Sequence, residues 1–160
     1  MSDTALTEAA ADQPARPEEK LGSLRDIVGV HLRLAHNALF RHFMDTLAHV
    51  DLTPKQTSVL WLIGELPGIA QIDLAARLDM DRASMMTIID RLESRDLVAR
   101  SRSKLDRRRQ DLHLTPTGVT VLAEARAAVS RHEAWLKDRL GSPADVTNFV
   151  EQLRRIYGQA

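Results

Sequence analysis

The spacing of apolar residues predicts a largely helical chain after residue 20. From Leu21 to about Val50, apolar side chains recur mostly every four residues, which predicts one long helix. The apolar positions of this helix are Leu24, Val28, Ala35, Leu39, Phe43 and Leu47. A small core does not cover a helix of that length, so the pattern favours a partner helix, for which a second subunit is one source.

A second helix is predicted to start at residue 53. Thr53 suits the N-cap, Pro54 the first helical position and Gln56 the reciprocal position of a capping box. The pair Pro67 and Gly68 ends this helix.

Two short helices follow with only "DM" between them, "QIDLAARL" at 71–78 and "DRASMMTIIDRLESRD" at 81–96. Asp81 fits the N-cap of the second, and its apolar face consists of Met85, Ile88, Ile89 and Leu92. Two helices joined by a tight turn, with polar and basic residues on the outer face of the second, predict a helix-turn-helix.

Alternating apolar and polar positions appear next, in "LVARSRS" and "RQDLHL". These runs flank the charged segment Lys104–Arg109, which predicts a β-hairpin with a charged tip. Thr115 and Pro116 then start a long helix that Gly141 ends, and Ser142 starts a final helix toward Tyr157. The predicted fold is mostly α, an α+β winged helix-turn-helix of six helices and a hairpin wing.

Composition limits the class of protein. The chain has 160 residues, enough for one domain with a sizeable core, and no cysteine, which excludes disulfides, thiolate metal sites and thiol-based redox sensing. No apolar run approaches the roughly 18 residues of a membrane span, and no signal-peptide pattern is present. We therefore expect a cytoplasmic location and no membrane partner.

The positive charge is concentrated although the net charge is zero. Residues 82–109 carry nine basic and four acidic side chains, and three of the basic ones are the consecutive Arg107, Arg108 and Arg109. A local basic patch is typical of a polyanion-binding surface, and a solvated hairpin tip is the alternative.

The runs "IDLAARLDMDRASMMTIIDRLESRDLVARS" and "LDRRRQDLHLTPTG" resemble the MarR family (multiple antibiotic resistance regulator type) of transcription factors. Asp106, Arg108, Leu114, Thr115 and Gly118 stand at the spacing of that family's wing signature. The resemblance covers about residues 21–157. It implies a homodimer that binds a pseudo-palindromic double-stranded DNA operator.

The residue pattern and the resemblance together divide the chain, and the first 20 residues are rich in Ala, Pro and acidic residues without periodicity. Residues 1–20 are expected to be a flexible tail, 21–50 a dimerisation helix, 51–114 the DNA-binding lobe and 115–160 the C-terminal dimerisation helices.

In the family the wing tip reaches the minor groove of DNA. Arg108 matches the arginine that enters the groove, and Asp106 matches the acid that holds it. A narrow minor groove attracts a guanidinium through its focused negative potential. Arg107 and Arg109 are then expected at flanking phosphates.

The outer face of the helix at 81–96 differs from that of many relatives, which carry a threonine and an arginine where this chain has Met86 and Thr87. We expect these two residues at thymine methyls, with Arg82 and Ser84 nearer the groove edge. A core position is the alternative for Met86. Arg91 and Arg95 are interpreted as phosphate contacts or as partners of Asp90 and Glu93, and the pairing is favoured for Arg91.

The absence of cysteine favours regulation by a small molecule over peroxide sensing. In relatives the ligand is often an aromatic carboxylate, a phenolic compound or its coenzyme A thioester. We expect the ligand site at His36, Asn37, Phe40, Arg41 and Trp61, because aromatic rings beside a guanidinium suit a flat anion. Core positions for Phe40 and Trp61, and a solvated Arg41, are the alternative.

An enzyme, an adaptor for protein–protein contact and a ligand-independent regulator are the other function classes. The chain has no HExxH motif, no Gly-rich phosphate loop and no convergent histidine cluster, so neither an enzyme nor a cofactor is expected. His113 and His132 are interpreted as structural. The remaining alternatives are a winged-helix adaptor for protein–protein contact and a DNA-binding regulator without a ligand.

Overall fold

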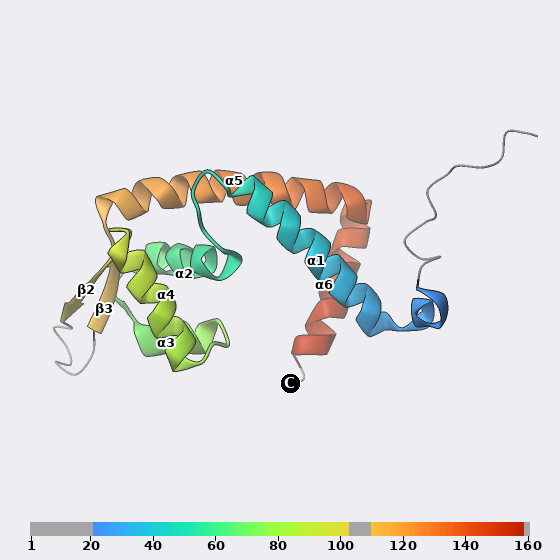
Figure 1. Cartoon of the computed structure of the whole chain (residues 1–160), viewed down its shortest axis with the longest axis horizontal. Helices are drawn as coiled ribbons and strands as arrows, with labels where there is room; N and C mark the ends of the chain where they lie inside the picture. The colour runs from blue at the N-terminus through green and yellow to red at the C-terminus, as the bar shows by residue number, and fades with distance from the viewer. Residues whose placement is uncertain (1–20, 103–109, 159–160) are drawn as a thin grey trace, which may run out of the picture. The chain divides into compact units, whose positions relative to one another are not determined.

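The computed structural model describes residues 21–102 and 110–158 (Figure 1). Residues 1–38 and 39–160 form two compact units, and each is described by itself. The segments 1–20, 103–109 and 159–160 lie outside the described residues, so the expected tail and the expected hairpin tip do too.

The predicted helix over 21–50 is wrong in its extent. A short 3₁₀ helix, η2 (Gly22–Asp26), comes first, and α1 covers only Val28–Thr46. Ile27 separates them with extended backbone, at φ −94° and ψ 107°. The far end is a turn that passes through Asp51 at φ 50°. Apolar spacing continues through both breaks, and no capping residue in the sequence marks them.

Most of the other helices begin at a capping residue, whereas the helix that follows Ala70 has no side-chain cap. Thr53 and Gln56 form the expected capping box at α2, and Asp81, Thr115 and Ser142 each accept a backbone N–H at the start of α4, α5 and α6. The helices are α2 (Pro54–Glu65), α3 (Gln71–Arg77), α4 (Arg82–Ser94), α5 (Pro116–Leu140) and α6 (Pro143–Tyr157). Local side-chain chemistry therefore sets most helix boundaries.

The expected hairpin is part of a three-stranded antiparallel sheet. Strands β2 (Val98–Arg102) and β3 (Gln110–Leu114) pair with each other, and β1 (Ile69–Ala70) pairs with the other edge of β3. Strand β1 was not predicted, because two residues cannot show an alternating pattern. Gly68 makes the turn before it, at φ 86°, and donates its N–H to the Leu112 carbonyl at 2.9 Å.

The core lies where the helices and the sheet meet. The predicted inner face of α4 is confirmed, with Met85, Ile89 and Leu92 buried and Ile88 partly buried. Other core side chains come from α2, α3, β3 and α5: Val59, Leu60, Ile63, Leu74, Leu112, Leu122 and Ala125. This packing fixes α3 and α4 as a helix-turn-helix against the wing strands.

The start of α5 explains two residues of the wing signature. The Thr115 hydroxyl accepts the Gly118 N–H at 2.9 Å and donates to the Asp96 carbonyl. A Cβ atom on Gly118 would lie 1.9 Å from the Leu97 carbonyl oxygen. Glycine is therefore required for α5 to approach the strand so closely. Within the described residues, no helix is both long and apolar enough to cross a bilayer.

Candidate nucleic-acid interface

Asp81 fixes the start of α4, the second helix of the helix-turn-helix. Its carboxylate accepts the Ser84 backbone N–H at 2.8 Å and the Ser84 hydroxyl at 2.6 Å. These hydrogen bonds hold the pKa of Asp81 below its usual value. The Ser84 hydroxyl, one of the expected groove-edge donors, is therefore engaged in capping.

The outer face of α4 carries the other expected groove residues. Arg82, Thr87 and Arg91 are exposed, and so is Met86, at 52%. Met85 is fully buried, so the core position belongs to Met85 and not to Met86. The Thr87 hydroxyl donates to the Ala83 carbonyl at 3.0 Å, which leaves its oxygen free to accept.

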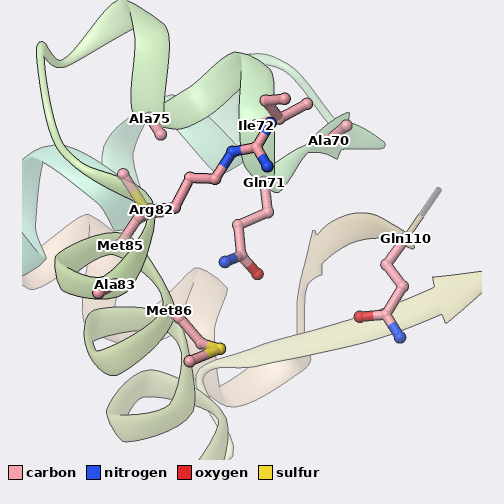
Figure 2. A pocket seen from close by; sticks show the side chains of 9 residues that line it. All are labelled: Ala70, Gln71, Ile72, Ala75, Arg82, Ala83, Met85, Met86 and Gln110. Atoms are coloured by element: carbon pink, nitrogen blue, oxygen red, sulfur yellow. The ribbon is translucent and has the colours of Figure 1, made fainter.

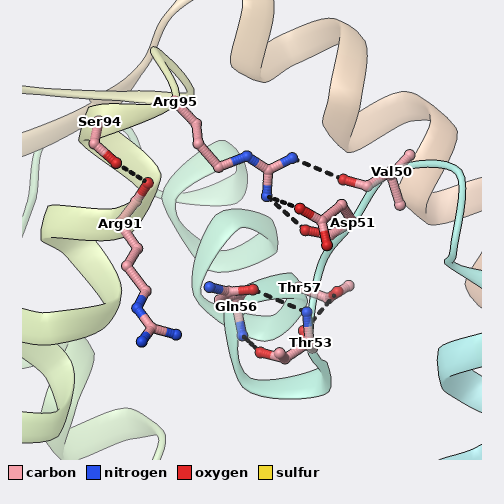
Figure 3. Close-up of polar contacts among 8 residues, drawn as sticks. All are labelled: Val50, Asp51, Thr53, Gln56, Thr57, Arg91, Ser94 and Arg95. Carbon is pink, nitrogen blue, oxygen red and sulfur yellow. Dashed lines mark hydrogen bonds and ion pairs between the residues drawn. The ribbon is translucent and has the colours of Figure 1, made fainter.

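Arg91 and Arg95 do not pair with Asp90 or Glu93, so the pairing alternative is wrong, whereas their expected contacts with DNA phosphates stay predictions. Arg95 donates to the backbone carbonyls of Asp51 at 2.5 Å and Val50 at 2.9 Å (Figure 3). It therefore fastens the end of α4 to the turn before α2. Arg91 forms no ion pair with a described residue, and Figure 3 shows its guanidinium away from this cluster.

The partner of both acids is Arg100 of β2, which the sequence analysis missed. Its guanidinium pairs with Asp90 at 2.5 Å and with Glu93 at a shorter contact, and its side chain is only 20% exposed. Asp90 and Glu93 are three residues apart, so they share one helix face, whereas Arg91 points about 100° away from Asp90. The wing and α4 are thus joined by charge as well as by packing.

Four expected wing residues cannot be placed. Asp106, Arg107, Arg108 and Arg109 lie outside the described residues. Of the two strands that lead to them, β2 contacts α4 and β3 contacts α3. Their roles at DNA stay predictions.

The expected ligand residues fall in both compact units. His36 and Asn37 belong to residues 1–38, whereas Phe40, Arg41 and Trp61 belong to residues 39–160. Phe40 and Arg41 are exposed, and Trp61 is partly buried against the core. Their joint role as a ligand site stays a prediction.

The guanidinium over Trp61 is that of Arg126 on α5, another residue that sequence reasoning missed. Its carbon lies 4.7 Å from the ring centroid. Glu65 accepts the indole N–H at 2.5 Å and lies 3.5 Å from Arg126. The Nε atom of Arg126 is buried without a hydrogen-bond partner among the described residues. Arg126 lies sixty-five residues after Trp61 in the sequence, so no local sequence pattern predicts their contact.

A pair of histidines joins the C-terminal part of α1 to α5. The Nδ1 atoms of His42 and His132 are 2.8 Å apart, so one imidazole donates to the other. Trp135 stacks on His42 with ring centroids 3.8 Å apart, and Phe43 meets the His132 ring edge to face. Burial, and secondarily the charge of His42, lowers the pKa of His132. In the described part of the chain, no cluster of three metal-ligating side chains occurs.

Comparison with known proteins agrees with this geometry. A family model described as "MarR family" matches residues 52–109. A transcriptional regulatory protein for the hcr operon of Thauera aromatica is 37% identical over 139 residues, which are 86% of this chain and 83% of that protein.

Solved structures with the same fold include the transcriptional repressor CouR. Bound to a 23-mer DNA duplex, it is 36% identical, with a TM-score of 0.79 over 85% of this chain and 96% of that one. Bound to p-coumaroyl-CoA, it is 34% identical, with a TM-score of 0.77 over 85% and 95% of the two chains. The residue pattern, the winged helix-turn-helix and these relatives agree: the chain belongs to the MarR family of transcriptional regulators.

Proposed function

We propose that this regulator is a repressor that binds a pseudo-palindromic DNA operator as a homodimer and is released by a small aromatic effector. The observation that carries the proposal is the exposed face of α4 beside the wing strands, with Arg82, Met86, Thr87 and Arg91 turned outward. An α-helix fits the major groove, and a wing beside it is suited to the adjacent minor groove. The DNA complex of CouR supports this assignment.

A homodimer is supported by the terminal helices. No residue of α6 is buried, and Val150, Ile156 and Tyr157 are exposed apolar side chains on it. Burial of such side chains against a second copy of the chain would stabilise a dimer. Two symmetric α4 helices then enter successive major grooves, which requires half-sites about 10 bp apart.

Selection of bound duplexes from a randomised pool tests DNA binding, and light scattering of the purified protein tests the dimer. We expect an inverted repeat with about 10 bp between half-site centres and a mass of two chains. A stable monomer at micromolar concentration, or the recovery of no consensus duplex, would contradict the proposal.

Arg108 gives the matching test of the wing. Arg108→Ala is expected to weaken operator binding by about 1–3 kcal/mol, with the fold and the dimer intact. Asp106→Ala should weaken it less, and Arg107→Ala should mainly reduce the salt dependence of binding. Unchanged operator affinity of Arg108→Ala at moderate salt would remove the minor-groove role.

The effector proposed is an aromatic acid, a phenolic compound or its coenzyme A thioester. Phe40, Arg41 and Trp61 are the proposed ligand residues of the larger unit, and Arg126 supports them, because it places a guanidinium with an unpartnered Nε beside the Trp61 ring. The CouR complex with p-coumaroyl-CoA also supports this class. Roles for His36 and Asn37 are proposed from the sequence alone. The effector would favour a lobe spacing that no longer matches the operator.

Thermal-shift measurements with benzoate, p-coumarate and p-coumaroyl-CoA, followed by operator release, test this site. The effective compound should stabilise the protein and lower operator affinity, and Arg126→Gln should lose the response. Arg131→Gln, an exposed arginine on the same helix, serves as the control. Equal responses of the two variants would contradict the assignment.

A further inference from the structure

A concavity of 680 Å³ lies between α3, α4 and the beginning of β3. Figure 2 shows Met86 of α4 and Gln110 of β3 on opposite sides of it, with Gln71 and Ile72 of α3 along a third side. The remaining lining residues are Ala70, Ala75, Arg82, Ala83 and Met85. Of these lining residues, only Arg82 and Met86 are expected at DNA from the sequence.

Apolar side chains make up most of the lining of the concavity. Ile72 is 48% exposed and Met86 is 52% exposed, and the small side chains of Ala70, Ala75 and Ala83 also line it. Exposed apolar side chains grouped on a functional face indicate an apolar partner group. In the major groove of DNA, the 5-methyl group of thymine is the apolar feature that a protein meets.

The remaining lining side chains are polar. Arg82, Gln71 and Gln110 supply a guanidinium and two carboxamides, all able to donate hydrogen bonds. Arg82 forms no ion pair with a described residue and is exposed. Donors of this kind suit the DNA backbone, because phosphate oxygens and sugars together take about half to two-thirds of the hydrogen bonds in protein–DNA interfaces. Apolar and polar side chains that line the same concavity therefore match one nucleotide with its phosphate.

We propose that this concavity takes one strand of the operator at a thymidine nucleotide. Ile72 and Met86 contact the thymine methyl, and Arg82 and Gln110 donate to the adjoining phosphates. The strand that separates the major groove from the minor groove passes between α4 and the wing, and the concavity lies between these two elements. This assignment rests on the DNA binding proposed above, and it makes Ile72 a specificity residue.

Replacing thymine by uracil in the selected operator tests the contact, because it removes a methyl group and nothing else. Each thymine of a half-site is replaced in turn, and affinities are measured by fluorescence anisotropy. For the wild-type protein, the replacement of thymine by uracil at one position should lower operator affinity about fourfold, the factor that corresponds to one buried methyl group. In Ile72→Ala and Met86→Ala, the thymine and uracil duplexes should bind equally at that position.

Val119→Ala is the control, since Val119 is a similarly exposed apolar residue (57%) that does not line the concavity. It should keep the fourfold difference. Circular dichroism and light scattering verify the fold and mass of every variant. A fourfold difference that persists in Ile72→Ala and Met86→Ala would overturn the methyl contact.

The two proposals fail in different ways. If the wild-type protein selects no operator, the proposed function fails. If it binds an operator tightly and no thymine shows the methyl effect, only this inference fails. If Ile72→Ala leaves operator binding and the methyl effect intact but loses the thermal shift with p-coumarate, the concavity is a small-molecule site and the assignment is wrong.

Discussion

At the scale of single residues, the wing signature has a structural side as well as a proposed DNA-binding side. Thr115 caps α5 and ties it to the Asp96 carbonyl, and Gly118 lets the first turn of that helix lie against Leu97. Neither residue needs DNA to explain its presence. A signature that resembles a functional family thus carries information on packing too.

Gly118→Ala tests the packing role. The added Cβ would lie 1.9 Å from the Leu97 carbonyl oxygen, so α5 must shift away from the strand. We expect a loss of at least about 2 kcal/mol in the free energy of unfolding, because a backbone atom cannot rotate out of the way. The measurement is urea unfolding followed by circular dichroism at fixed protein concentration.

Thr120→Ala, an exposed position on the same helix, is the matched control and should change stability by less than about 1 kcal/mol. A Gly118→Ala protein as stable as the wild type would show that the helix start tolerates a side chain.

At the scale of secondary-structure elements, helix starts were predictable and long-range pairs were not. Thr53, Asp81 and Ser142 mark their helices because an N-cap acts on backbone N–H groups two or three residues away. The ends of α1 carry no such signal, and the two-residue β1 exists only through its pairing with β3. Boundaries set by distant segments are absent from a local pattern.

In the candidate site, too, the sequence predicted which residues are buried but not which residues pair across elements. The sequence predicted that Met85 is buried, because helical spacing decides which side of α4 faces the core. It did not predict the partners of Asp90 and Glu93, which come from a different element. Arg100 and Arg126 were missed for this reason, since each acts across elements.

Arg100 links α4 to β2, the two elements proposed to face DNA, and Arg100→Gln tests that link. Without it, Asp90 and Glu93 stand uncompensated beside a polyanion and the wing loses its tie to α4. We expect operator binding to weaken by about 1–2 kcal/mol, since like-charge repulsion opposes association. Fluorescence anisotropy at several salt concentrations provides the measurement.

Two further variants separate charge from position. Arg131→Gln makes the same change of charge at an exposed position of α5 and should have little effect on operator affinity. Adding Asp90→Asn and Glu93→Gln to Arg100→Gln should restore part of the affinity, because the repulsion is gone. If Arg100→Gln bound the operator as tightly as the wild type, this electrostatic role would be excluded.

At the scale of the whole molecule, the His42–His132 pair couples folding to pH. The two Nδ1 atoms are 2.8 Å apart. One proton therefore fits between the two rings, whereas a proton on each of the facing nitrogens does not. Burial and the neighbouring His42 lower the pKa of His132, while Glu133 opposes the shift. The folded protein therefore keeps His132 neutral at pH values where the unfolded chain protonates it.

The sign of the pH dependence follows from this difference. The unfolded histidine takes up its proton near its ordinary pKa of 6.5, and the folded one does so only at lower pH. Below 6.5 the unfolded state thus binds more protons, so the free energy of unfolding decreases as the pH is lowered, until the folded pKa is reached. Above 6.5 the stabilisation is complete. The slope contributed by this group is at most about 1.4 kcal/mol per pH unit.

Urea unfolding between about pH 5.5 and 8 measures this effect. The protein concentration is kept constant, because dimerisation makes the apparent stability depend on it. The wild-type protein should lose stability on the acidic side. His132→Gln should show a smaller loss over the same interval, because the depressed group is gone. His49→Gln, an exposed histidine, should keep the wild-type slope. Equal slopes in His132→Gln and the wild type would show that other groups set the acid sensitivity of the fold.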